Sequence, residues 1–206
     1  MEQIIKFLTE KYQPLTLIVY GSYADGTYDK DSDFDCLIVT RRPSARHDAS
    51  IVHGVQLDAF IYAPEELEGD IDPYEFLQIE NGSIITDTHG IAILLKEKVR
   101  AFLSRLPEKS RDELLTALEW FEKMVRRTAR KDAEGYFRWH WLLCDSLELY
   151  CDLTGQRYLG PKKTLSGMER RNPEGYALYF AALRELDEKL ISDWIGYLRK
   201  LADQQL

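Results

Sequence analysis

The sequence lacks the cysteine content of a disulfide-stabilised secreted protein. Among its 206 residues there are only three cysteines, Cys36, Cys144 and Cys151, and no Cys-x-x-Cys pair. An odd number of widely spaced cysteines argues against a disulfide framework and indicates a reducing compartment. We therefore expect all three thiols to act as small apolar side chains.

Long apolar runs and a leader segment are absent as well. The longest apolar stretches, such as residues 15–20 and 91–95, are far shorter than the ~18 residues that a transmembrane helix needs. The first residues, MEQIIKFLTEK, contain no apolar run followed by a small-residue cleavage site. These absences predict a soluble cytoplasmic protein with no membrane partner.

A broadly basic composition is the third missing feature. The chain has 27 Lys plus Arg against 35 Asp plus Glu, a formal net charge of −8. Proteins that coat nucleic acid present a basic face, so this balance argues against nucleic acid as a main partner. The 45% hydrophobic and 12% aromatic content excludes a disordered chain. The sequence does not determine the oligomeric state and leaves a homodimer open.

The two halves of the chain differ in charge and in pattern. Residues 1–95 contain 6 bases and 17 acids, whereas residues 96–206 carry a net charge of +3. Short β-rich runs with turn signals fill the first half, and long helical periodicity fills the second. We predict an α+β protein: a small mixed β-sheet domain with flanking helices over residues 1–95, followed by an α-helical bundle over residues 96–206.

Periodicity and turn signals give the expected elements. Strands are predicted at 15–20, 34–40, 55–62 and 83–87, with short helices between 64 and 80. Helices are predicted at 2–12, 90–106, 110–130 and 134–154, and Pro173 should open one or two more. Ser110 and Glu113 have the spacing of a capping box, and Gly155 is expected just past a helix end.

The candidate chemistry begins where the first predicted strand ends. The strand LTLIVY runs into Gly21 and Ser22, and the next strand starts around Asp33, Phe34 and Asp35. Alternation along a strand would point Asp33 and Asp35 the same way, about 6 to 7 Å apart. Neighbouring carboxylates resist joint ionisation unless a cation compensates. Oxygen ligands suit Mg²⁺ or Mn²⁺, and two such ions can align a triphosphate with an attacking hydroxyl.

A third carboxylate lies in the strand VQLDAFIY. Asp58 is flanked by apolar residues, where an acid needs a partner or a role. If this strand pairs beside strand 34–40, Asp58 completes a three-carboxylate cluster that can bind metal and accept a proton. Gly21 lets the backbone approach a ligand closely, and Ser22 at a helix start suits a phosphate.

These residues resemble a known signature. The stretch GSYADGTYDKDSDFDCLIV is similar to the motif of the nucleotidyltransferase superfamily related to DNA polymerase β, and a further Asp follows on a later strand. The resemblance implies that Gly21 and Ser22 hold the nucleotide phosphates. It also implies that Asp33 and Asp35 bind the metals and that Asp58 is the third carboxylate.

The domain layout adds to this resemblance. A catalytic domain followed by a helical bundle is similar to the aminoglycoside and lincosamide nucleotidyltransferases, which move a nucleoside monophosphate from an NTP to a drug hydroxyl. A further marker is Asp87 with Gly90, which resembles the turn that closes the catalytic domain in this group. The other acids of the motif region, Asp25, Asp29 and Asp31, are interpreted as solvated turn residues.

The second half contributes four candidates. Lys162 and Lys163, in a loop after Gly160, are candidates to contact phosphates. Asp145 and Glu148 share one helix face at spacing i, i+3. One of them is a candidate acceptor-side acid; the alternative interpretation is an outward polar stripe that includes the Arg138 side chain.

Together these features predict a metal-dependent enzyme. The expected reaction transfers AMP from ATP, or a monophosphate from another NTP, to a hydroxyl of a small molecule with release of pyrophosphate and with two Mg²⁺ or Mn²⁺ ions as cofactors. The acidic first half favours a cationic acceptor such as an aminoglycoside. Two alternatives remain: nucleotidylylation of a protein side chain, as in toxin–antitoxin pairs, and a catalytically silent nucleotide-binding module.

Overall fold

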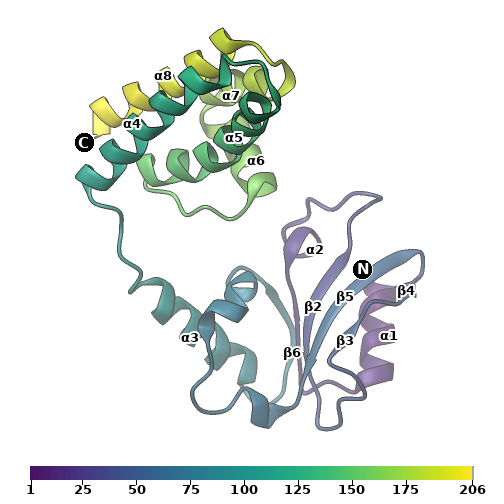
Figure 1. Ribbon diagram of the computed structural model, residues 1–206. Helices are drawn as coiled ribbons and strands as arrows, with labels where there is room; N and C mark the ends of the chain where they lie inside the picture. Colours follow the sequence, from purple (N-terminus) through teal and green to yellow (C-terminus); the bar gives the residue numbers. More distant parts are fainter. Residues whose placement is uncertain (206) are drawn as a thin grey trace. The chain divides into compact units, whose positions relative to one another are not determined.

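The chain folds into two compact units, Met1–Leu106 (unit 1) and Pro107–Leu206 (unit 2), in a computed structural model that describes residues 1–205 (Figure 1). The boundary expected after residue 95 falls inside helix α3 (Ile91–Leu103), whose buried face packs in the core of unit 1. On the observed boundary, unit 1 holds 10 bases and 18 acids and unit 2 holds 17 of each. Unit 1 therefore carries the whole net negative charge.

Unit 1 is a six-stranded mixed sheet with helices on both faces. Its elements in chain order are α1 (Glu2–Tyr12), β1 (Thr16–Val19), α2 (Gly21–Asp25), β2 (Phe34–Val39), β3 (His47–Asp48), β4 (Ile51–Val52), β5 (Val55–Tyr62), the 3₁₀ helices η1 (Pro64–Glu66) and η2 (Pro73–Ile79), β6 (Ser83–Asp87) and α3. The strand order is β3-β5-β2-β1-β6, and β4 pairs with β5. Only the β2–β5 pair is parallel among the described pairings.

Alternation along the strands divides the core of unit 1 into two layers. Leu17 and Val19 of β1 pack with α1 on one face of the sheet. Ile18 and Tyr20 pack with α3 and η2 on the other. Figure 1 shows α1 and α3 on opposite sides of the sheet. Successive apolar residues from Leu17 to Tyr20 therefore belong alternately to two separate apolar clusters.

Asp87 joins the sheet to helix α3. Its carboxylate accepts a hydrogen bond from the Thr16 hydroxyl at 2.9 Å and from the Ala92 backbone N–H at 3.1 Å. Gly90 precedes the helix with φ of 73°. The Asp87–Gly90 marker thus acts as a helix cap at the end of the last strand.

Unit 2 is a helical bundle. Its helices are α4 (Arg111–Thr128), α5 (Ala133–Leu153), α6 (Pro161–Arg171), α7 (Pro173–Arg184) and α8 (Glu188–Gln205). Trp194 is fully buried in its core and donates from Nε1 to the Ser146 hydroxyl at 2.9 Å. None of the helices in residues 1–205 combines the length and the apolar character needed to cross a membrane.

The predicted fold class is confirmed, as are most of the predicted elements. Ser110 and Glu113 form the expected capping box, and Gly155, with φ of +63°, follows the C-cap residue Thr154 of α5. The prediction for the cysteines is wrong at Cys144, which is exposed on α5, because the helix turns it away from the core that buries Cys151. Strands β3 and β4 were not predicted, because two residues are too few to show the alternation of apolar and polar side chains that identifies a strand.

The short strand β3 is attached to α1 by one carboxylate. Asp48 accepts hydrogen bonds from Lys11 Nζ at 2.8 Å, from the Tyr12 hydroxyl at 2.5 Å and from the Ser50 backbone N–H at 3.0 Å. Burial disfavours the charged form of this carboxyl, but the three hydrogen bonds outweigh it and hold the Asp48 pKa well below its usual value. The ionised side chain therefore stabilises the packing of β3 on α1.

We predict that Asp48→Asn lowers the free energy of unfolding at pH 7 by about 1 to 3 kcal/mol, because hydrogen bonds to a charged acceptor are lost. A folded-state pKa below the unfolded value gives stability that is present above about pH 4 and is lost as the pH falls further. Urea unfolding followed by circular dichroism at pH 7 and pH 3 should show a smaller acid loss in this variant. Asp31→Asn, at an exposed carboxylate, is the control, and equal acid sensitivity of wild type and Asp48→Asn would refute the prediction.

Candidate functional site

The centre of the candidate site is a pair of carboxylates on neighbouring strands. Asp35 of β2 and Asp58 of β5 are direct register partners in the parallel pair, so their strands lie about 4.8 Å apart at this point. Their neighbours Phe34 and Leu57 are buried in the α1 layer, which places both carboxylates on the opposite face. The structure thus brings together the two acids that the sequence predicted to meet.

Gly21 lies directly against the carboxylate of Asp35. A Cβ built on this glycine would be only 2.1 Å from Asp35 Oδ2, and its φ is +66°. Both facts require glycine at this position, since a side chain would displace the carboxylate and strain the backbone. The turn is closed further by a backbone hydrogen bond from the Tyr20 N–H to the Asp35 carbonyl at 3.1 Å. The backbone of the β1–α2 turn and the carboxylate of β2 therefore share one site.

Helix α2 starts at this turn. Its N-cap is Tyr20, in extended conformation and with no side-chain capping hydrogen bond, so the first N–H groups of the helix receive no side-chain acceptor from the cap. Ser22, the second residue of α2, is half-buried. Backbone N–H groups beside a hydroxyl are the groups that hold an anion at a helix start.

The loop between α2 and β2 is ordered by its own acids. Asp25 accepts hydrogen bonds from the backbone and hydroxyl of Thr27, and Asp29 accepts from the Asp31 N–H. Asp25 and Asp29 thus act as turn residues, as the sequence predicted. Tyr28 of this loop stacks on Tyr23 of α2, with ring centroids 4.3 Å apart.

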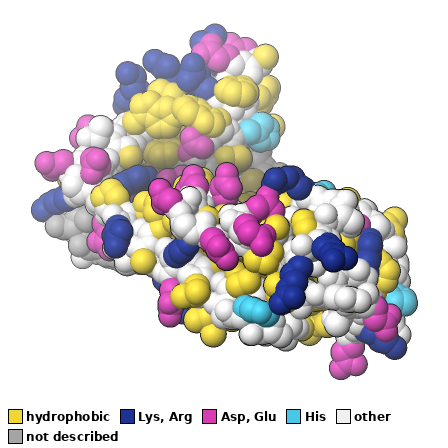
Figure 2. Space-filling view, turned by 90° about the horizontal axis from the view of Figure 1, so that it is seen from below, with side chains coloured by type: hydrophobic (Ala, Val, Ile, Leu, Met, Phe, Trp, Pro, Cys, Tyr) yellow, Lys and Arg dark blue, Asp and Glu magenta, His cyan; other side chains and the backbone are white. Residues whose placement is uncertain are grey.

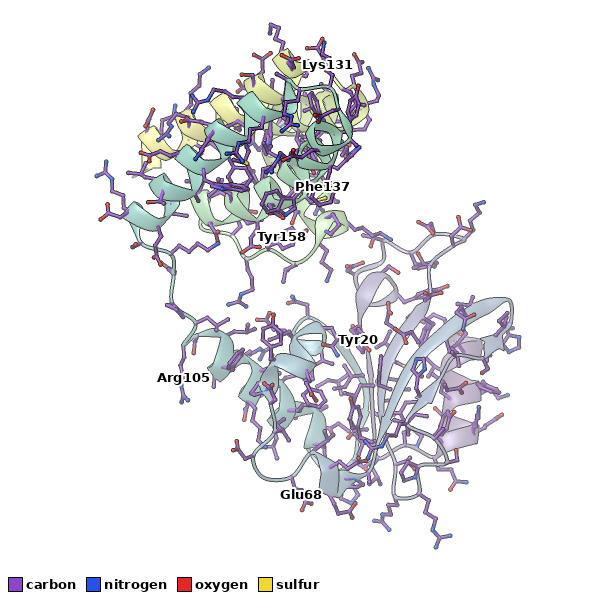
Figure 3. The ribbon with its side chains drawn as sticks, viewed as in Figure 1. Tyr20, Glu68, Arg105, Lys131, Phe137 and Tyr158 are labelled. Atoms are coloured by element: carbon purple, nitrogen blue, oxygen red, sulfur yellow. The ribbon has the colours of Figure 1, made fainter. Side chains whose placement is uncertain are left out.

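Tyr20 is a site residue that the sequence reasoning missed. It is 6% exposed, and burial, followed by the charges of Asp58 and Asp35, raises the pKa of its hydroxyl far above the usual value. The phenol therefore stays neutral beside the two carboxylates and can donate a hydrogen bond. Figure 3 labels Tyr20 at the end of β1. Two features of the sequence could have identified Tyr20 as a site residue: it directly precedes Gly21, and strand alternation places it on the same face as Ile18.

Asp33 directly precedes the first residue of β2 and is exposed. Its alignment with Asp35, two residues further along the chain, stays a prediction. Within residues 1–205, no group of three or more His, Cys, Asp or Glu side chains is close enough to hold a metal ion. Asp35 and Asp58 nonetheless supply adjacent carboxylate oxygens, the donors that Mg²⁺ and Mn²⁺ prefer. The donor set of this face therefore fits such an ion.

Lys162 and Lys163 belong to unit 2 and to a helix. They were expected in a loop, but Pro161 is the first residue of α6 and both lysines occupy its first turn. Proline at this position presets the helical φ, and Gly160, with φ of +87°, makes the break just before it. The contact of these lysines with phosphates stays a prediction.

Asp145 and Glu148 lie on α5 of unit 2. Glu148 forms an ion pair with Lys109 Nζ at 3.2 Å. Asp145 is half-buried, and burial, followed by the charge of Glu148, raises the pKa of its carboxyl. Arg138 forms an ion pair with Glu134, one helical turn earlier on α5, and among the ion pairs of the described residues it has none with Asp145 or Glu148. Of the two acids, Asp145 is thus the better candidate for an acceptor-side acid.

The contact between Gly21 and Asp35 yields a stability prediction. Gly21→Ala should lower the free energy of unfolding of unit 1 by about 1 to 3 kcal/mol more than Gly26→Ala, because only the first methyl group collides with a side chain. Gly26 is the matched control: its φ is +77° and its added Cβ meets no atom within 4 Å.

The measurement can separate the two units. All four tryptophans lie in residues 107–206, so tryptophan fluorescence in urea follows unit 2, whereas circular dichroism follows both units. Both substitutions should shift only the part of the transition that fluorescence does not detect. Equal losses for the two variants would show that Asp35 does not lie against Gly21.

A family model matches the part of the chain that carries this site. Residues 1–127 match the family model of the nucleotidyltransferase domain. A search of curated proteins gave no match. A nucleotidyltransferase-like protein from Exiguobacterium sibiricum 255-15 aligns with 19% identity over 98% of this chain and 74% of its own, with a TM-score of 0.40.

A second solved structure is spectinomycin adenyltransferase AAD(9) from Enterococcus faecialis with ATP and spectinomycin. It aligns with 13% identity over 98% of each chain, and its TM-score is also 0.40. The family model covers more than half of the chain and includes the Gly21 turn, Asp35 and Asp58. The chain therefore belongs to the nucleotidyltransferase domain family.

Proposed function

We propose that this protein transfers AMP from ATP to a hydroxyl group of a small-molecule acceptor and releases pyrophosphate. The observation that carries the proposal is the packing of the Gly21 backbone against Asp35, with Asp58 as the register partner of Asp35. A glycine turn at a helix start and two adjacent carboxylates are the parts needed to hold a triphosphate and a divalent cation.

In this proposal the β1–α2 turn binds the nucleotide. The backbone N–H groups of Gly21 and Ser22, with the Ser22 hydroxyl, bind the phosphates. Asp33, Asp35 and Asp58 are the residues that would hold two Mg²⁺ or Mn²⁺ ions, which when bound neutralise the charge that develops on the phosphoryl oxygens. The chain contributes mainly positioning, since phosphoryl transfer needs little covalent chemistry from the protein.

The transfer forms one phosphorus–oxygen bond, breaks another and releases one proton, which a carboxylate accepts. The acceptor hydroxyl oxygen forms a bond to the α-phosphorus of ATP while the bond from that phosphorus to the bridging oxygen breaks. Pyrophosphate leaves with the bridging oxygen, and Asp58 accepts the proton of the attacking hydroxyl. Asp58 suits this role because its strand position places it beside Asp35 and its side chain is 39% exposed, so an acceptor can reach it.

Charge favours a cationic acceptor, such as an aminoglycoside. Unit 1 contains 18 acids and 10 bases, and on the face that Figure 2 presents its acidic side chains gather into a group. A field of one sign raises the local concentration of ligands of the opposite sign. Asp145 of unit 2 is the acid we propose on the acceptor side, and Lys162 and Lys163 are proposed to contact the triphosphate.

The central test measures transfer itself. The protein is incubated with α-labelled ATP, MgCl₂ and a panel of aminoglycosides, lincosamides and protein acceptors, and pyrophosphate and labelled product are quantified. We expect Asp35→Asn and Asp33→Asn to lower the rate by roughly 100- to 1000-fold, the scale for loss of one electrostatic group from a preorganised site.

The matched control is Asp31→Asn, which makes the same substitution in the same loop at an exposed carboxylate paired with Lys30. It should retain wild-type activity. Unchanged rates in both Asp33 and Asp35 variants would refute the mechanism. Labelling only of protein acceptors would favour protein nucleotidylylation, and calorimetric ATP binding without turnover on any acceptor would favour the silent module.

Metal removal gives a second prediction. Dialysis against EDTA should abolish pyrophosphate release on the best acceptor, and Mg²⁺ or Mn²⁺ should restore it, because the adjacent carboxylates and the triphosphate all carry negative charge. The measurement is a titration of each ion into the metal-free protein. Full activity in EDTA would exclude the proposed role of the carboxylates.

A further inference from the structure

His47 touches the third carboxylate of the site. Its Nε2 lies 2.6 Å from Asp58 Oδ1, a hydrogen bond in which the imidazole donates to the ionised acid. His47 stands opposite Phe60 in the β3–β5 pair, and the two rings lie 4.9 Å apart. Asp58 is two residues from Phe60 on the same face of β5, which brings the imidazole over its carboxylate.

The strand that carries His47 is held in place from its other side. Asp48 points the opposite way, to Lys11 and Tyr12 of α1, and has a nearly buried side chain. Backbone hydrogen bonds from the Ile61 N–H to the Arg46 carbonyl and from the Leu57 N–H to the Ser50 carbonyl close the two ends of the segment. A strand of only two residues is thus fixed in register, and alternation directs His47 at Asp58.

The exposure of the pair argues against a role in folding. The side chains of His47 and Asp58 are 45% and 39% exposed. Side-chain hydrogen bonds and charge contacts with that much solvent exposure contribute little to stability, because water competes with them and screens them. A contact that is well positioned and yet contributes little to folding is better explained by what it does to Asp58.

We propose that His47 is the positioning residue for Asp58: it binds Oδ1 and leaves Oδ2 oriented for the divalent cation. This inference rests on the proposed function. Partners that bind one oxygen of a metal-ligating carboxylate restrict its rotation and orient the other, and their loss typically costs 10- to 100-fold in metal affinity or activity. The sequence motif does not include His47, and the two-residue strand that carries it is too short to be predicted from the sequence.

The test measures Mn²⁺ affinity by electron paramagnetic resonance, in the full chain with a non-hydrolysable ATP analogue. His47→Leu should weaken Mn²⁺ binding about 10- to 100-fold. His47→Gln should stay close to wild type, since the glutamine amide can donate from about the position of Nε2. The control is His89→Leu, which removes another exposed imidazole of unit 1 and should change nothing. The urea midpoint should be the same in all variants.

A double variant separates positioning from a structural effect. In an Asp58→Ala background, His47→Leu should cause no further loss of Mn²⁺ affinity, because the oxygen that His47 contacts is gone. Wild-type affinity in His47→Leu, or an equal loss in both backgrounds, would overturn the proposal. The measurement needs no turnover, so a protein that transfers nothing to any acceptor would refute the proposed function while the affinity ratios still decide the role of His47.

Discussion

The parallel pairing of β2 with β5 is the constraint on which the candidate site depends. It places Asp35 directly beside Asp58, at the edge where β1 also ends in the Gly21 turn. Two carboxylates on adjacent strands repel each other, so the arrangement has a cost unless a cation is bound. The sheet supplies the stiffness that holds them together, since Phe34 and Leu57 are buried beneath on the other face.

Around this pair, each neighbour has a position that follows from strand geometry. Gly21 leaves room for the Asp35 carboxylate because it has no side chain. Tyr20 is a buried, neutral phenol near the two carboxylates. His47 contacts Asp58 from β3, which Asp48 attaches to α1. The site is therefore supported by elements from both layers of unit 1, and not by the motif segment alone.

The net negative charge lies in unit 1, and this division depends on where the boundary between the units is drawn. Counted to residue 95, the second half appeared basic, but α3 and its flanking residues bring four bases into unit 1. Unit 2 is then neutral, and some of its cations form ion pairs, such as those of Lys109 and Arg138 with acids of α5. The net negative charge of the protein accordingly belongs to unit 1.

The sequence by itself determined the fold class, the four longer strands of the sheet and the family, because alternating apolar runs and the Gly-Ser and Asp-x-Asp spacing are local patterns. It also identified Asp35 and Asp58, although their pairing was conditional on a strand order that only the tertiary structure decided. The positions of His47 and Tyr20 beside these carboxylates and the helical setting of Lys162 were likewise decided by the fold. Such features depend on contacts between segments far apart in the chain, and no local pattern specifies which strand edge or helix face will meet.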